Sequence, residues 1–165
     1  MTTHPGAAVR RPATSEHKPG VMLAVYLLAC AAVAYLGSLA TTSNVDGWYR
    51  DADKPPFNPP NWLFGPVWSV LYVAMAVAVW LAWKRGAPTG IWWLQLALNL
   101  AWTPVFFGME ELWWGLVVIV LLDLAVLATI VVFRRTSQAA AWLLVPYLGW
   151  TLFATALNAS IAALN

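Results

Sequence analysis

The chain has 165 residues, of which 61% are hydrophobic and only 10% are charged, and it contains 12 tryptophans. A soluble domain carries roughly 25% charged residues, so this composition excludes a soluble enzyme and indicates a membrane protein. The net charge of +2 is small and divided among several segments, which excludes nucleic acid as a partner.

Residues 1–20 are rich in Pro, Thr, His and Arg and have no apolar period, so we expect a mobile tail outside the membrane. Five apolar segments follow, at residues 21–40, 62–83, 91–108, 112–133 and 139–164, and each is long enough to cross a bilayer. The predicted fold is all-α, with one membrane domain over residues 21–165 that forms a bundle of five transmembrane helices. Short joints predict that consecutive helices are antiparallel neighbours.

The single cysteine, Cys30, lies inside the first apolar segment, so no intramolecular disulfide is expected. An alternative is a lipoprotein signal that ends at Cys30. The apolar run continues to Ala40, which favours a spanning helix over a cleaved signal of about 7–15 apolar residues.

Basic residues collect on one side of the membrane if the chain crosses it five times. That side holds Glu16 and the basic residues Arg10, Arg11, Lys18, Lys84, Arg85, Arg134 and Arg135; the other holds Arg50, Lys54, Asp46, Asp51, Asp53, Glu110 and Glu111. The positive-inside rule predicts a cytoplasmic N-terminus and an external C-terminus and first loop. We expect the protein to reside in a bacterial cell membrane.

Most tryptophans fall at the ends of the predicted helices, where an amphipathic ring favours the headgroup region. These are Trp62, Trp83, Trp92, Trp93, Trp113, Trp114 and Trp142. Trp68, Trp102 and Trp150 fall inside helices, so they are candidates for lining a pocket; the alternative is that they fill space between helices.

Helical spacing groups polar and aromatic residues of three segments on inward faces. Gln95, Asn99, Trp102 and Phe106 share one face of the third helix, Tyr147, Trp150, Ala154 and Asn158 share one face of the fifth, and Trp68 and Tyr72 lie one turn apart in the second. Amides avoid lipid, so these faces point to interhelical hydrogen bonds or to a ligand pocket that opens outward beneath the first loop.

Ala97 and Ala101 form a small-residue stripe on another face of the third helix, which is a candidate homodimer contact. Asp123 lies near the middle of the fourth helix without a basic partner in any helix, so we expect it to be protonated or hydrogen-bonded, with proton coupling as an alternative. The sequence contains no catalytic triad, no phosphate-binding loop and no set of metal ligands.

Three motifs occur in order: WYRDADKPPFNPPNWLFGPVWSVLY in the first loop and second helix, QLALNLAWTPVFFG in the third, and VPYLGWTLFATALN in the fifth. From about residue 21 to residue 158, the chain resembles the translocator protein family, also called tryptophan-rich sensory proteins (TspO/MBR). The resemblance implies a five-helix membrane fold, often dimeric, that binds porphyrins such as protoporphyrin IX, drugs of the isoquinoline or benzodiazepine type, and sterols, and that requires no cofactor.

The resemblance also implies roles for individual residues. Trp68 and Trp150 match the tryptophans that flank the porphyrin and that are linked to its light-dependent and oxygen-dependent degradation, while the matching motifs carry Asn99, Trp102, Ala154 and Asn158 to the ligand side. The first loop covers the pocket with Arg50, Lys54, Pro55, Phe57 and Asn58. Where relatives often carry tryptophan after Lys-Pro, this chain has Pro56 and Phe57, and the cholesterol-recognition pattern is absent from its C-terminal end.

The leading hypothesis is a membrane sensor, regulator or scavenger that binds a porphyrin between Trp68 and Trp150, with its carboxylates near Arg50 and Lys54. One alternative is an enzyme in which these tryptophans oxidise the bound porphyrin. Another is a transporter of porphyrin or other apolar solutes that depends on Asp123.

Overall fold

The computed structural model describes residues 19–45 and 47–165, and within these residues every regular element is a helix. In chain order the elements are α1 (Pro19–Val45), α2 (Trp48–Asp51), the 3-10 helix η1 (Asn61–Leu63), α3 (Phe64–Trp83), α4 (Gly90–Thr103), the π-helix η2 (Pro104–Gly108), α5 (Leu112–Arg134) and α6 (Gln138–Leu164). The expected tail lies outside the described residues except at its end, because α1 already begins at Pro19.

Within the described residues, four helical segments are long and apolar enough to cross a membrane. These are Pro19–Thr42, Asn61–Trp83, Leu112–Arg134 and Gln138–Leu164. The third predicted helix is divided between α4, with 14 residues, and η2, with 5 residues, so neither part reaches the length of the others.

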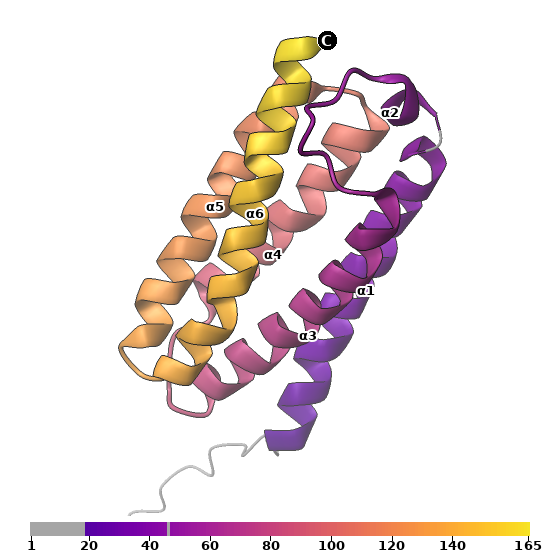
Figure 1. Cartoon of the computed structure of the whole chain (residues 1–165). Helices are drawn as coiled ribbons and strands as arrows, with labels where there is room; N and C mark the ends of the chain where they lie inside the picture. The colour runs from indigo at the N-terminus through magenta and orange to yellow at the C-terminus, as the bar shows by residue number, and fades with distance from the viewer. Residues whose placement is uncertain (1–18, 46) are drawn as a thin grey trace, which may run out of the picture.

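The five main helices form a closed ring in the order α1, α3, α6, α5, α4, since each of these packs mainly against its two neighbours in that order. The α3–α4 and α5–α6 loops lie at the end of the bundle where α1 begins, whereas α2 and the C-terminus lie at the opposite end (Figure 1). The expectation that all consecutive helices are neighbours is therefore wrong for α3 and α4, which α1 separates in the ring. The short connection between α3 and α4 requires that they run antiparallel, but it does not require that they pack against each other.

The third predicted helix ends in a π-helix, η2. Its wider turn is closed by a 2.9 Å hydrogen bond from the Met109 N–H to the Pro104 carbonyl oxygen. Phe106 and Phe107, although adjacent in the sequence, are both buried.

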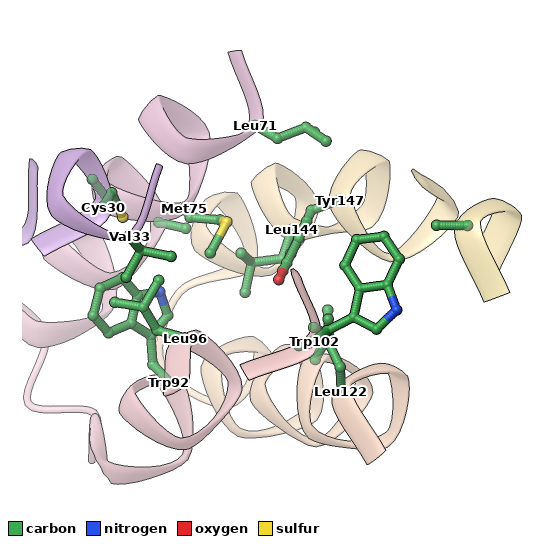
Figure 2. Packing of buried hydrophobic residues seen from close by; sticks show 14 of the residues in the cluster. Cys30, Val33, Leu71, Met75, Trp92, Leu96, Trp102, Leu122, Leu144 and Tyr147 are labelled. Carbon is green, nitrogen blue, oxygen red and sulfur yellow. The ribbon is translucent and has the colours of Figure 1, made fainter. Parts of the chain in front are cut away.

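The core fills the ring with apolar side chains from all five of these helices. Cys30 and Val33 of α1 lie close to Trp92 and Leu96 of α4, and Met75, Leu144 and Tyr147 occupy the centre (Figure 2). Trp92 is fully buried and packs edge-on against Tyr26, with ring centroids 5.3 Å apart. The expectation that Trp92 lies at the membrane interface is therefore wrong, whereas Trp62, Trp113, Trp114 and Trp142 are all exposed at helix ends.

Candidate ligand-binding site

A cavity of about 390 Å³, here called the large cavity, lies between α1, α3 and the α4–η2 segment, beneath α2. Its volume is within the roughly 300–1,000 Å³ range of small-molecule sites. The residues that line it are Ala34, Gly37, Ser38, Thr41, Thr42, Val45, Tyr49, Asn61, Phe64, Gly65, Trp68, Ser69, Tyr72, Trp102, Thr103 and Phe107.

The lining of the large cavity combines aromatic rings with neutral polar groups. Trp68 and Tyr72 form one wall with ring centroids 5.5 Å apart, and Trp102 belongs to the opposite helix. Hydroxyl groups of serine and threonine supply hydrogen-bonding atoms, and none of the lining residues carries a formal charge. Such a lining suits an uncharged, planar, largely apolar group, because stacking and burial supply the attraction.

A hydrogen-bond network of Tyr72, Asn99 and Tyr147 connects α3, α4 and α6. The Tyr72 hydroxyl donates to Asn99 Oδ1 at 2.6 Å, and Asn99 Nδ2 donates to the Tyr147 hydroxyl oxygen at 3.0 Å. The sequence left open whether Asn99 forms an interhelical hydrogen bond, and the structure shows that it does. Gln95 is also buried, but neither of its amide atoms has a hydrogen-bond partner in the described part of the protein.

A second, much smaller space of about 20 Å³, here called the small pocket, lies on the α6 side. Phe106, Ala154 and Asn158 line it together with four aromatic residues that also line the large cavity. Asn158 accepts a 3.2 Å hydrogen bond from Trp102 Nε1 and donates a 2.9 Å bond to the Leu112 carbonyl oxygen. A space of this size holds about one water molecule.

Trp150 lines neither space. Its ring packs against Phe64, with centroids 5.9 Å apart, and against Phe153 at 5.5 Å. Trp68 packs instead against Tyr147, with ring centroids 6.2 Å apart. The sequence predicted an open cleft between Trp68 and Trp150, but Phe64 occupies the position next to Trp150 and borders the large cavity.

The first loop closes the end of the bundle through buried aromatic anchors. Tyr49 is buried and donates a 2.9 Å hydrogen bond to Asn58 Oδ1, while Trp48 Nε1 donates to the Phe107 carbonyl oxygen at 2.9 Å. Burial raises the pKa of Tyr49 to about 12. The Trp48 bond attaches α2 to η2, and Tyr49 and Phe107 both line the large cavity.

The basic residues of the loop do not line either space. Lys54 Nζ donates to the carbonyl oxygens of Tyr49, Arg50 and Ala52 at 2.5, 2.9 and 2.9 Å, so it caps α2. Arg50 forms an exposed 3.0 Å ion pair with Asp51, and its hydrogen bond to that carboxylate lowers the pKa of Asp51.

The remaining loop residues contact the C-terminal half of α6 and the residue after it. Pro55 is buried, and the exposed Phe57 packs on Phe153 with ring centroids 6.3 Å apart. The backbone N–H of Asp53 donates to Asn165 Oδ1 at 3.1 Å, and Asn165 Nδ2 donates to the Asp53 carbonyl oxygen at 3.0 Å. The loop is therefore attached to the last residue of the chain at two points.

Three further predicted residues lie away from the large cavity. Asp123 Oδ2 accepts a 2.6 Å hydrogen bond from the Thr155 hydroxyl, which joins α5 to α6. Ala97 and Ala101 are exposed on the outer surface of α4. Residues 19–45 and 47–165 contain no group of three or more His, Cys, Asp or Glu side chains that could hold a metal ion.

The α1 wall of the large cavity was not predicted from the sequence. It consists of Ala34, Gly37, Ser38, Thr41, Thr42 and Val45. The available signal was the spacing of small and hydroxyl residues at Gly37, Ser38, Thr41 and Thr42 near the end of an otherwise apolar helix. Phe64, Thr103 and Phe107 were also missed, because single residues of these types are common in any membrane helix.

The long apolar helices and the neutral aromatic cavity define a helical membrane protein with an internal cavity. Residues 26–164 match the model of the TspO/MBR family. The chain is 43% identical to the tryptophan-rich protein TspO of Archaeoglobus fulgidus over 148 residues, which cover 87% of this chain and 96% of that protein.

Relatives from other organisms show the same extent of similarity. The chain is 39% identical to the human translocator protein, covering 85% of this chain and 88% of that protein, and 38% identical to the tryptophan-rich sensory protein of Cereibacter sphaeroides, covering 85% and 89%. The chain therefore belongs to the TspO/MBR family and is an integral membrane protein.

Proposed function

We propose that this protein binds a porphyrin of the protoporphyrin IX type in the large cavity and acts as a tetrapyrrole sensor, regulator or scavenger. The observation that carries the proposal is a cavity of about 390 Å³ between Trp68, Tyr72 and Trp102 whose lining has no charged side chain. An aromatic macrocycle gains from stacking on such walls. Relatives named tryptophan-rich sensory protein and translocator protein support a sensory or translocating role.

The porphyrin carboxylates belong at the loop end of the site in this proposal. Lys54 caps α2 and is therefore less suited to bind them than the sequence suggested. Arg50 is exposed on the same loop beside Asp51, so it remains the better cation for a carboxylate that extends out of the cavity.

The proposed topology has five crossings, with α4 and η2 together as the third. In Figure 1 this segment runs beside α5 along the bundle. The loops that carry Lys84, Arg85, Arg134 and Arg135 lie at one end, which we assign to the cytoplasm together with the N-terminus. The first loop and the C-terminus are then external, and the membrane is a bacterial cell membrane.

We also propose a homodimer in which the exposed stripe of Ala97 and Ala101 lets two copies of α4 approach closely. Trp93, which is 42% exposed, lies one turn before Ala97 on the same face and adds aromatic surface to this contact.

Porphyrin binding is tested by titrating detergent-purified protein with protoporphyrin IX in darkness while tryptophan fluorescence is followed. The proposal predicts saturable quenching that Trp68→Phe weakens several-fold. Trp142→Phe is the matched control, because Trp142 is 71% exposed and does not line the large cavity. Equal affinities for the wild type and Trp68→Phe would contradict the placement of the ligand.

The same titration under light distinguishes the enzyme alternative. Bleaching of porphyrin absorbance that depends on Trp68 or Trp150 would favour oxidation of the ligand. The transporter alternative has weaker support, because Asp123 is bonded to Thr155 between α5 and α6 and does not line the large cavity. Porphyrin flux into proteoliposomes that Asp123→Asn abolishes would favour it.

A further inference from the structure

Four basic residues lie at the end of the bundle where α1 begins. Lys84 and Arg85 follow α3, and Arg134 and Arg135 stand at the end of α5. We call these four residues the basic cluster. All four are exposed, and none forms an ion pair with an acidic residue of the described ranges 19–45 and 47–165. The acidic residues of the first loop and of the α4–α5 connection lie at the opposite end (Figure 1).

A hydrogen bond joins the two loops that carry the basic cluster. Arg85 Nη1 donates to Ser137 Oγ, and Ser137 caps α6 by accepting a 3.3 Å bond from the Ala140 N–H. Arg135 is two residues before Ser137, so their Cα atoms lie within about 7 Å of each other. A guanidinium group has five N–H donors, and the bond to Ser137 uses one of those of Arg85. The other donors of this exposed side chain can bind a ligand beside Arg135.

The end of α3 is also attached to the start of α1. Trp80 Nε1 donates to the Pro19 carbonyl oxygen at 2.8 Å, and Lys84 Nζ lies over the Trp80 ring, 4.3 Å from its centroid. A cation over an aromatic face is attracted by the ring. This contact keeps the Lys84 ammonium group close to the end of its helix, on the same side of the bundle as Arg85.

The basic cluster lies at the depth of the lipid headgroups. The apolar spans of α3 and α5 end at Trp83 and Arg134, and the span of α6 begins at Gln138. Each cation is therefore within two residues of the end of a span, where the lipid phosphates lie. Trp142, which is 71% exposed, follows Ser137 by five residues, or about 7 Å along α6. An indole ring at that depth favours the interface below the phosphates.

We propose that the basic cluster binds the headgroup of an anionic phospholipid of the phosphatidylglycerol type, with Arg85 and Arg135 as the main ligands of its phosphate. Guanidinium groups donate strong, charge-assisted hydrogen bonds to phosphate oxygens. Basic residues next to membrane helices attract anionic lipids. A zwitterionic lipid carries its own cationic group, which the four cations repel, so the cluster selects lipids with a net negative charge. This inference does not depend on porphyrin binding.

The test is a lipid titration of the full chain in detergent, followed by native mass spectrometry. We expect phosphatidylglycerol to bind several-fold more tightly than phosphatidylcholine with the same acyl chains. The double variant Arg85→Gln, Arg135→Gln should bring this ratio close to one, because each cation near an anionic headgroup contributes about five-fold in affinity. Arg50→Gln is the matched control: this exposed arginine lies at the opposite end, beside Asp51, and its loss should leave the ratio unchanged. A wild-type ratio in the double variant would overturn the inference.

A second variant separates the charge of the cluster from the bond between the two loops. The double variant Arg134→Gln, Arg135→Gln keeps the contact of Arg85 with Ser137 and removes two cations. We expect it to lower the ratio several-fold while the thermal midpoint in detergent stays close to that of the wild type. A ratio that this variant leaves unchanged would contradict the electrostatic recognition of the lipid.

Inorganic phosphate distinguishes a lipid headgroup from a free anion as the ligand. Sodium phosphate and sodium chloride are added at equal ionic strength during the titration with phosphatidylglycerol. We expect the two salts to weaken lipid binding equally, because both only screen the charges. Stronger competition by phosphate than by chloride would assign the basic cluster to a free anion and overturn the lipid assignment.

Discussion

The Tyr72 hydroxyl lies 2.6 Å from Asn99 Oδ1, and this bond ties a wall of the large cavity to the centre of the helix bundle. Asn99 also donates to Tyr147, so one amide fixes side chains from α3 and α6. A polar group in this position is unfavourable unless it is bonded, which makes the three residues depend on one another. The shape of the ligand site is therefore coupled to the stability of the bundle.

Asn99→Leu should lower the stability of the bundle, because it leaves the hydroxyls of Tyr72 and Tyr147 without this partner. We expect a loss of about 1–3 kcal/mol, seen as a lower thermal midpoint in detergent. Ser69→Ala is the control, since the exposed Ser69 hydroxyl bonds only the backbone one turn earlier in its own helix, at Gly65. A midpoint equal to that of the wild type would contradict the structural role of the network.

Gly115→Ala should destabilise the junction of α5 with α6 and η2. A Cβ atom at this position would lie 3.1 Å from Asn158 Oδ1 and 3.3 Å from Phe106, which is closer than ordinary packing. Overpacking of this kind costs about 1–3 kcal/mol. Gly149→Ala is the matched control: an added Cβ there meets nothing within 4 Å, so that variant should be neutral or stabilised in thermal unfolding.

Lys54→Ala should loosen the first loop without unfolding the bundle. The ammonium group bonds three carbonyl oxygens around α2, and its loss leaves them to water. We expect faster proteolysis within residues 47–60 and faster amide exchange of α2. Arg135→Ala is the control, because this exposed residue lies at the opposite end of the bundle, and it should change neither rate. Similar rates for Lys54→Ala and the wild type would contradict the capping role.

Alkaline pH should release the first loop through Tyr49. Burial raises the pKa of Tyr49 from 10.0 to about 12, so the folded loop holds the phenol proton more tightly than the open loop. This contribution is fully present below pH 10 and is lost as the pH rises towards 12. Amide exchange of α2 should accelerate in this range in the wild type, and Tyr49→Phe should remove the added pH dependence.

The helical fold could be predicted from the sequence because uninterrupted apolar segments and short polar joints leave few other arrangements. The ring order could not, since joint length does not decide that α1 rather than α4 packs against α3. The π-helix at Pro104 also escaped prediction. Phe107 is buried beside Phe106, and the single inward face that helical spacing assigned to this segment did not include it.

The candidate site was predicted best where residues contrast with a lipid environment. Trp102, which lines the large cavity, stood out because a central indole is unusual in a membrane helix, and Asn99, which bonds the lining residue Tyr72, stood out because an amide is. The Gly37 and Thr41 wall of α1 gave a much weaker signal. Trp150 shows the limit of periodicity. Spacing identified its inward face, but only packing shows that Phe64 stands between it and the large cavity.

The most direct test of the account is whether a porphyrin enters the large cavity. In a Cys30→Ala background, Ser38→Cys introduces a thiol in the cavity lining and Ser160→Cys introduces one outside it. Each thiol is alkylated with N-ethylmaleimide in darkness, with and without protoporphyrin IX. The account predicts that porphyrin slows alkylation at position 38 in a saturable manner and leaves position 160 unchanged. Equal alkylation at position 38 with saturating porphyrin would contradict it.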